Sequence, residues 1–292
     1  MSQQKFTPEQ LSKAYKTACM AELQAIKPGN VHVFADGHGM TIDDFIQSAD
    51  VTADIIARPD LSPGERIWYA VEATQNAVGQ NTNLGMLLLC VPIIDAALQL
   101  ADNQSLQQSL HASLAKLTIS DAQWVAKAIV LANPGGLGGA AQYDVHETPQ
   151  VNLLEMMREA QDRDRIAWQY ANGFEDILGF GITRFRDAMT RWENPAWAAA
   201  ALYLGFLTRV PDTHVLRKYG NSMAQTLMQE AADIEQLYWQ TDNPKLVQKQ
   251  LLNWDASLKQ RGINPGTSAD LTVATLLADH LLQLNLTKRK LI

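Results

Sequence analysis

The chain has 292 residues, of which 47% are hydrophobic, enough apolar material for one large core or two smaller ones. Its formal net charge is −7, from 24 Lys and Arg against 31 Asp and Glu, so it has no basic surplus for a nucleic-acid backbone. It shows no signal-peptide-like start, no apolar run long enough to cross a bilayer, and no CxxC pairing of its two cysteines. These features predict a cytoplasmic protein that binds neither nucleic acid nor membrane.

Apolar residues recur at three- and four-residue spacing along nearly the whole chain, and alternating β-branched patterns are scarce. Helix starts are well marked: Ser62-Pro63-Gly64-Glu65 combines a capping serine, a first-turn proline and the glutamate of a capping box. The sequence therefore predicts an all-α fold, a single compact multi-helix domain over residues 1–292. We expect helices over 7–26, 42–57, 63–78, 83–100, 105–116, 120–133, 150–161, 164–178, 182–192, 195–208, 213–240, 244–261 and 268–286. We also expect a central cleft lined by the inter-helix loops 27–40, 79–85, 133–147, 209–213 and 262–268.

The first of these loops begins Lys27-Pro28-Gly29-Asn30. A lysine before a Pro-Gly turn is favoured at a helix C-terminus by the helix dipole alone, which is one interpretation. The other is that Lys27 faces a phosphate, with Gly29 and Asn30 beside it as backbone and amide ligands.

The predicted helix 63–78 carries Glu72 between apolar Val71 and Ala73. An inward-facing glutamate must be paired, hydrogen-bonded or bound to a metal. This favours a catalytic or metal-binding role for Glu72 over that of a solvent-facing helix charge.

The turn after that helix reads Gly79-Gln80-Asn81-Thr82-Asn83-Leu84-Gly85. Asn81, Thr82 and Asn83 all suit a helix cap, but the next helix needs only one of them. The remaining side chains, with Gly85 and the free N–H groups of a helix start, suit a phosphate.

The strongest cluster of helix-breaking residues, with one proline and four glycines, lies at residues 133–139 and starts a long mid-chain loop. The N–H groups of Gly135 and Gly136 form an anion nest in one interpretation, and the segment is a plain connector in the other. Farther along, Asp144 opens an Asp-x-His-Glu group that can hold a metal, although its spacing matches no strict zinc pattern. Asp164, which leads into an apolar segment, is a further candidate.

Two more acidic residues stand at predicted helix starts. Asp212 follows Pro211 and suits an N-cap, and Asp270, three residues after Thr267, suits a capping box next to Ser268. The alternative is a shared carboxylate site lined by loop ends.

Taken in order, these segments resemble the triphosphoribosyl-dephospho-CoA synthases over most of the chain. That family consumes ATP and dephospho-CoA, releases adenine, and makes the precursor of the prosthetic group of citrate and malonate decarboxylases. The resemblance implies that Glu72, Asp212 and Asp270 are catalytic and that Glu72 and Asp212 hold Mg²⁺, to which the Asp-x-His-Glu group adds Asp144 as a third expected ligand. It implies phosphate or nucleotide contacts from Lys27, Gly29, Asn81, Thr82, Gly85 and Ser268. Asn30, Asn83, Gly135 and Gly136 join these expected contacts because of their own side chains or backbone N–H groups. The resemblance is carried by Glu22 with Lys27-Pro28-Gly29, Glu72, Asn81-Thr82-x-x-Gly85, Asp212 and Pro265-Gly266-x-Ser268-Ala269-Asp270-Leu271.

The chain also departs from that family. Where the family's box reads Asn-Thr-His-Lys-Gly, Asn83 and Leu84 stand in place of the histidine and lysine, and a His-x-Asp-Met stretch is reduced to His38-Gly39-Met40. In these respects the chain resembles a divergent branch found in archaea and methylotrophic bacteria, and the acceptor substrate stays open.

Displacing adenine at the ribose C1′ passes through an oxocarbenium-like state, and a carboxylate must stabilise it or activate the attacking hydroxyl. A triphosphate calls for Mg²⁺, which needs only one or two carboxylates besides phosphate oxygens. We therefore expect a transferase that takes ATP as substrate, Mg²⁺ as cofactor and a small nucleotide or coenzyme as partner. Two alternatives are a transferase or ligase that builds a one-carbon carrier coenzyme of the tetrahydromethanopterin or methylofuran type, and a non-catalytic nucleotide-binding protein. A homodimer is compatible with the sequence.

Overall fold

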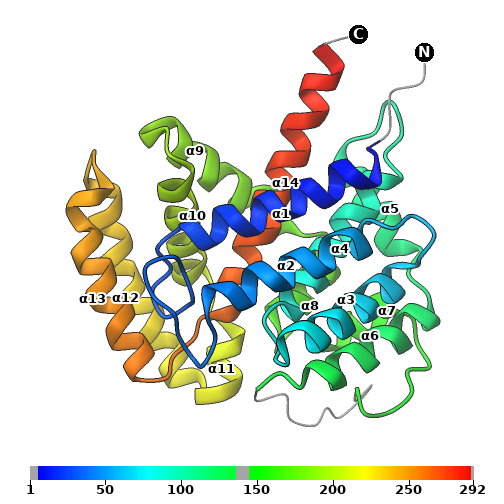
Figure 1. The fold of residues 1–292 in the computed structure, drawn as a ribbon, viewed down its shortest axis with the longest axis horizontal. Helices are drawn as coiled ribbons and strands as arrows, with labels where there is room; N and C mark the ends of the chain where they lie inside the picture. The colour runs from blue at the N-terminus through cyan, green and yellow to red at the C-terminus, as the bar shows by residue number, and fades with distance from the viewer. Residues whose placement is uncertain (1–5, 136–144, 291–292) are drawn as a thin grey trace.

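The computed structural model describes residues 6–135 and 145–290 and shows an all-α protein, as predicted (Figure 1). Within these ranges there is no β-strand, and the only β-type backbone pairings are two isolated bridges, from His32 to Ala35 and from Gly37 to Met40. None of the helices there is long and apolar enough to cross a membrane. The elements are α1 (Pro8–Gln24), α2 (Ile42–Ile56), α3 (Pro63–Val78), α4 (Leu84–Leu98), α5 (Leu106–Ala115), α6 (Ile119–Ala132), α7 (Leu153–Ala160), α8 (Arg165–Ala171), the π-helix η1 (Asp176–Gly181), α9 (Ile182–Trp192), α10 (Pro195–Arg209), α11 (Thr213–Tyr219), α12 (Asn221–Gln240), the 3₁₀-helix η2 (Pro244–Val247), α13 (Gln248–Gln260) and α14 (Gly266–Lys290).

Capping boxes fix the starts of α1, α2, α3, α5 and α6. In the box predicted for α3, the Glu65 N–H donates to Ser62 Oγ at 3.3 Å and the Ser62 N–H donates to Glu65 Oε2 at 2.9 Å. Each box satisfies N–H groups that have no partner inside the helix, so these starts are set by local sequence.

Two predicted helices are interrupted. The helix expected over 164–178 ends at Ala171, because Gly173 and Phe174 take φ values of 62° and 61° and the chain continues into η1. The helix expected over 213–240 is broken at Gly220, whose φ of 82° and ψ of 172° leave the helical region. Both predictions were too long because a glycine there takes a backbone conformation that ends the helix.

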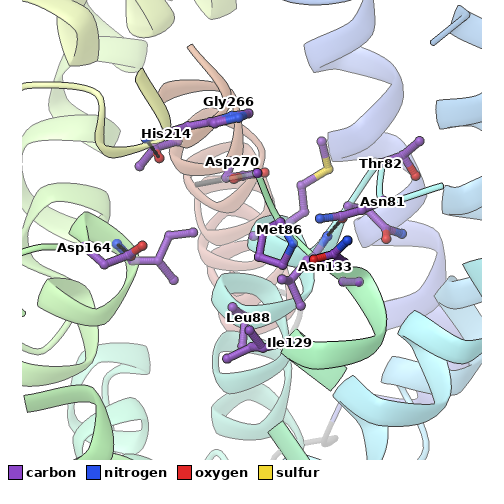
Figure 2. A pocket seen from close by; sticks show the side chains of 18 of the residues that line it. Asn81, Thr82, Met86, Leu88, Ile129, Asn133, Asp164, His214, Gly266 and Asp270 are labelled. Carbon is purple, nitrogen blue, oxygen red and sulfur yellow. Dashed lines mark hydrogen bonds between the residues drawn. The ribbon is translucent and has the colours of Figure 1, made fainter. Parts of the chain in front are cut away.

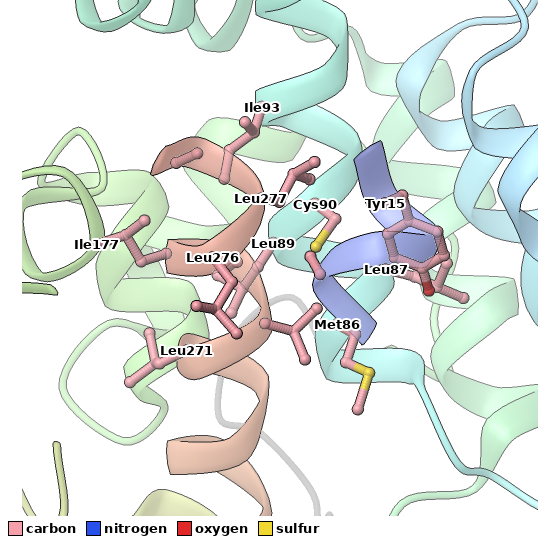
Figure 3. Packing of buried hydrophobic residues seen from close by; sticks show 14 of the residues in the cluster. Tyr15, Met86, Leu87, Leu89, Cys90, Ile93, Ile177, Leu271, Leu276 and Leu277 are labelled. Atoms are coloured by element: carbon pink, nitrogen blue, oxygen red, sulfur yellow. The ribbon is translucent and has the colours of Figure 1, made fainter. Parts of the chain in front are cut away.

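The core is built around α4, which is apolar on all sides. All of its residues except Gly85 and Leu98 are buried. It packs against α14 over much of its length, with α1 on another side, and Figure 3 shows side chains of the three helices meeting around Leu89 and Cys90. The N-termini of α4 and α14 consequently lie close together, and this fixes the position of the site described next.

Candidate functional site

A cavity of about 700 Å³ opens where α4 and α14 begin, a volume in the usual range for small-molecule sites (Figure 2). The short helices α7, α8 and α11 and the end of α6 form its other walls. Four of the five loops expected to line a cleft contribute to it. Their lining residues are Asn30 and Met40, Gly79 to Asn83, Asn133 to Gly135 with Val145, and Asn264.

One side of the cavity is apolar and another is rich in amides. Leu88 and Ile129 lie together at the bottom of the view in Figure 2, and Met156 and Met157 of α7 also line the cavity. Asn81, Thr82 and Asn133 lie together on another side, with Asp270 near the centre. Such a division suits a ligand with a flat apolar part and a strongly polar part.

Asp270 projects from the first turn of α14 against the first turn of α4. A Cβ built on Gly85 would lie 1.9 Å from Asp270 Oδ2, so only glycine fits beneath this carboxylate. Among the described residues, Asp270 accepts no hydrogen bond and makes no ion pair. Burial raises the pKa of Asp270 well above its usual range; the carboxylates of Asp212 and Glu22 raise it further, while Arg217 opposes the shift.

The start of α4 offers unused hydrogen-bond donors to the cavity. Asn81 Oδ1 accepts from the Leu84 N–H at 3.1 Å, whereas the N–H groups of Gly85 and Met86 have no partner in the described part of the chain. Asn83 is buried, its Oδ1 accepts from Thr74 at 3.1 Å, and its Nδ2 also lacks a partner there. These free donors at a helix N-terminus favour an anion.

The wall opposite the amides carries His214, Arg217 and Asp164. His214 Nδ1 lies 2.5 Å from where a Cβ on Gly266 would stand, so glycine is required at the start of α14 as well. Burial lowers the pKa of His214, and Asp212 only partly counters this, so the imidazole is neutral at neutral pH. Arg217 forms an ion pair with Asp164, the N-cap residue of α8.

Lys27 lies behind the cavity wall. Its ammonium is fully buried, forms an ion pair with Glu22 and donates to Asn30 Oδ1 at 2.9 Å. Asn30 does line the cavity and donates to Asn264 Oδ1 at 2.8 Å. Gly29 serves the loop itself, with a φ of 84° and an N–H bonded to Asp255 Oδ1 at 2.8 Å.

Asp212 and Ser268 also lie behind the wall, where they join two helix starts. Asp212 Oδ1 accepts from the N–H groups of His214 at 3.0 Å and Val215 at 3.1 Å. Asp212 Oδ2 accepts from the N–H and from the hydroxyl of Ser268, both at 2.8 Å. With four hydrogen bonds, this carboxylate fixes α11 to α14 and has little capacity left for a ligand.

Glu72 is half-buried on α3 and does not line the cavity. Asp144 and Gly136 fall outside the described residues, whereas Gly135 is a lining residue. In the ranges 6–135 and 145–290, no three His, Cys, Asp or Glu side chains gather in a way that could hold a metal. Of the three expected metal ligands, Glu72 and Asp212 do not line the cavity and Asp144 lies outside the described residues, so their grouping stays a prediction.

Comparison with known proteins identifies the family. Residues 8–289 match the family described as ATP:dephospho-CoA triphosphoribosyl transferase. The chain belongs to this family. It is thus a nucleotide-dependent transferase. No functionally curated protein matches the chain significantly.

A solved structure has the same fold as this transferase. It is a crystal structure from Archaeoglobus fulgidus described as a provisional triphosphoribosyl-dephospho-CoA synthase, with 22% sequence identity and a TM-score of 0.60. The match covers 81% of this chain and 97% of that one. At this identity the likeness shows the fold alone.

The sequence did not single out the cationic part of this transferase's cavity. Arg163 and Arg217 are the only described lining residues with a permanent positive charge. A signal for Arg217 was present, because it stands three positions after His214 and so shares a helix face with it. Arg163 lies in a mixed-charge stretch that is typical of a solvated surface, and nothing in the sequence marks it.

Proposed function

We propose that this protein transfers the triphosphoribosyl group of ATP to a ribosyl hydroxyl of dephospho-CoA, releases adenine, and uses Asp270 as the general base. One observation carries the proposal: an unpartnered carboxylate with a raised pKa projects into the cavity beside the free N–H groups of α4. A carboxylate of raised pKa is suited to accept a proton near neutral pH. We place this activity in the cytoplasm.

The chemistry is a substitution at the ribose C1′. The acceptor oxygen forms a bond to C1′ while the bond from C1′ to the adenine nitrogen breaks, and the bonding electrons leave with adenine. Asp270 takes the hydroxyl proton, and adenine gains one proton, so the overall reaction releases none. The ionised Asp270 also stabilises the positive charge that develops on the ribose.

Different walls of the cavity suit different parts of the nucleotide. The apolar side around Leu88 and Ile129 suits a nucleobase, and the N–H groups of Gly85 and Met86 suit phosphate oxygens. The phosphate role predicted for the Asn81–Gly85 turn is part of this proposal.

The residues present fit a magnesium ion that arrives with the nucleotide. Asp164 and Asp270 are the only carboxylates among the described lining residues, and Mg²⁺ bound to a triphosphate needs only one or two. The unpartnered oxygens of Asp270 make it the better placed of the two. When bound, the ion neutralises part of the charge on the triphosphate.

A different acceptor is the second candidate. Leu84 and Asn83 line the cavity where the resembled family has a lysine and a histidine, so one permanent charge is missing from this wall. That change favours an altered partner, such as a precursor of a one-carbon carrier coenzyme of the pterin or furan type. A purely nucleotide-binding role is disfavoured, because a free Asp270 carboxylate repels phosphate and serves a binder poorly.

The test is to incubate the protein with ATP, Mg²⁺ and dephospho-CoA and to measure free adenine by chromatography. Stoichiometric adenine supports the proposal, and Asp270→Asn should abolish the release while retaining nucleotide binding. Adenine release only with a pterin or furan precursor would support the second candidate. Nucleotide binding without adenine release from any acceptor would contradict both.

A further inference from the structure

The cavity has few cations available for a polyphosphate. Lys27 is held by Glu22 behind the wall, His214 is neutral, and Leu84 carries no charge. Arg165, at the start of α8, and Arg209, at the end of α10, are both bound to the buried Asp176. Of the lining residues that the structure describes, only Arg163 and Arg217 remain.

Arg163 and Arg217 differ in how they are placed. Arg163 is exposed, and its guanidinium donates to the Glu159 carbonyl at 3.2 Å. The Arg217 side chain is 22% exposed and bonds to Asp164 through one terminal nitrogen. Its Nε has no hydrogen-bond partner among the described residues, so one edge of the guanidinium is unused.

Asp164 can release Arg217 without losing its other task. Its Oδ1 accepts from the N–H groups of Ile166 and Ala167, at 2.8 Å and 3.2 Å, and caps α8. Only Oδ2 binds Arg217. If the guanidinium moves, the cap stays in place and the start of α8 does not change.

We propose that Arg217 is the residue that binds the nucleotide's polyphosphate, and that Asp164 holds it in position while the cavity is empty and then gives it up to the phosphate. The proposal rests on the proposed function, because it requires that a nucleotide binds in this cavity. A guanidinium presents parallel N–H donors that match two phosphate oxygens, and such charge-assisted bonds are stronger than neutral ones. Arg217 thereby supplies the charge that Leu84 does not.

Asp164 competes with the ligand in this arrangement. It attracts the same guanidinium and, once free, repels the phosphate. Removing its charge should therefore tighten nucleotide binding, an outcome that a purely structural ion pair does not predict. An asparagine at this position can still cap α8.

The experiment is calorimetric titration of the full chain with Mg·ATP, AMP and adenosine, without any acceptor. Arg217→Gln should weaken Mg·ATP binding by about 10- to 100-fold, weaken AMP binding less, and leave adenosine binding within about twofold. Asp164→Asn should bind Mg·ATP more tightly than the wild type. Arg163→Gln, which removes the other lining cation, is the matched control and should change Mg·ATP affinity by less than about threefold.

Two comparisons keep the result interpretable. The variant Asp164→Asn/Arg217→Gln, set against Asp164→Asn alone, measures the contribution of Arg217 without leaving an unpaired Asp164. Unchanged Mg·ATP affinity in this pair, or an equal loss for adenosine, would overturn the role of Arg217. Equal losses in Arg163→Gln and Arg217→Gln would overturn its assignment to one residue. A wild type that binds neither Mg·ATP nor adenosine would instead refute the proposed function itself.

Discussion

Replacing Lys27 by Met tests whether this lysine serves the fold or the substrate. The Lys27 and Glu22 side chains are 0% and 1% exposed, and Lys27 Nζ also donates to Asn30. Removing one partner of a buried ion pair leaves the other charge uncompensated, which typically costs about 3–5 kcal/mol. We expect Lys27→Met to lose this much free energy of unfolding at pH 7, whereas Glu22→Leu/Lys27→Met should be within about 1 kcal/mol of the wild type or more stable.

Urea unfolding followed by circular dichroism measures both values, and its pH dependence has a defined sign. Burial raises the pKa of Glu22 in the folded state, and loss of Lys27 removes the charge that opposes this shift. A group whose folded pKa lies above its unfolded pKa loses stability as pH rises, so Lys27→Met should recover part of its loss between pH 7 and pH 5. The double variant should keep Mg·ATP affinity within about twofold.

Two results would refute this reasoning. A loss below about 1 kcal/mol in Lys27→Met would mean that the pair is not a buried ion pair in solution. A stable double variant with much weaker Mg·ATP binding would restore the interpretation of Lys27 as a phosphate ligand.

Three further predictions concern the cavity. Asp270→Asn should abolish adenine release yet raise the free energy of unfolding at pH 7 by about 1–3 kcal/mol, because it removes a half-buried carboxylate without hydrogen bonds among the described residues. Desolvation raises the folded pKa of Asp270, so the gain should shrink as pH falls toward 4 in urea titrations. Gly85→Ala places a methyl group 1.9 Å from Asp270 Oδ2 and should cost about 1–3 kcal/mol and most of the activity. Gly135→Ala, whose methyl group would meet no atom of the described residues within 4 Å, should change neither stability nor nucleotide affinity appreciably. Calorimetry should show ATP binding more tightly with Mg²⁺ than without it, and equal affinities would contradict a role for the ion in neutralising the triphosphate.

The sequence predicts the helices well because their signals are local. Capping boxes such as Ser62 with Glu65, and apolar repeats such as that of α4, act within a few residues of the chain. The two wrong extents follow from glycines, since nothing local decides whether Gly173 or Gly220 takes a positive φ.

The site is harder to predict because its roles depend on partners far along the chain. Asp212 and Asp270 both resemble capping carboxylates at helix starts, yet Asp212 is hydrogen-bonded to Ser268, 56 residues away, while Asp270 lies against Gly85 with no hydrogen bond to a described residue. Lys27 was the cation expected to face a phosphate and Arg217 was not singled out, but of the two only Arg217 lines the cavity. Residue type and spacing cannot distinguish a group consumed by a tertiary partner from one that is free.

The close approach of Gly85 and Asp270 also bears on motion. Both residues stand near the N-termini of α4 and α14, two helices with many residues in the core, so the proposed reaction centre is fixed to the part of the molecule that should open least often. The helices that move when a substrate binds should then be α7 and α11 in the other walls of the cavity, because they are only 8 and 7 residues long. Hydrogen exchange should accordingly be slowest in α4 and the first half of α14 and fastest in α7 and α11, and a nucleotide should slow exchange mainly in those two short helices.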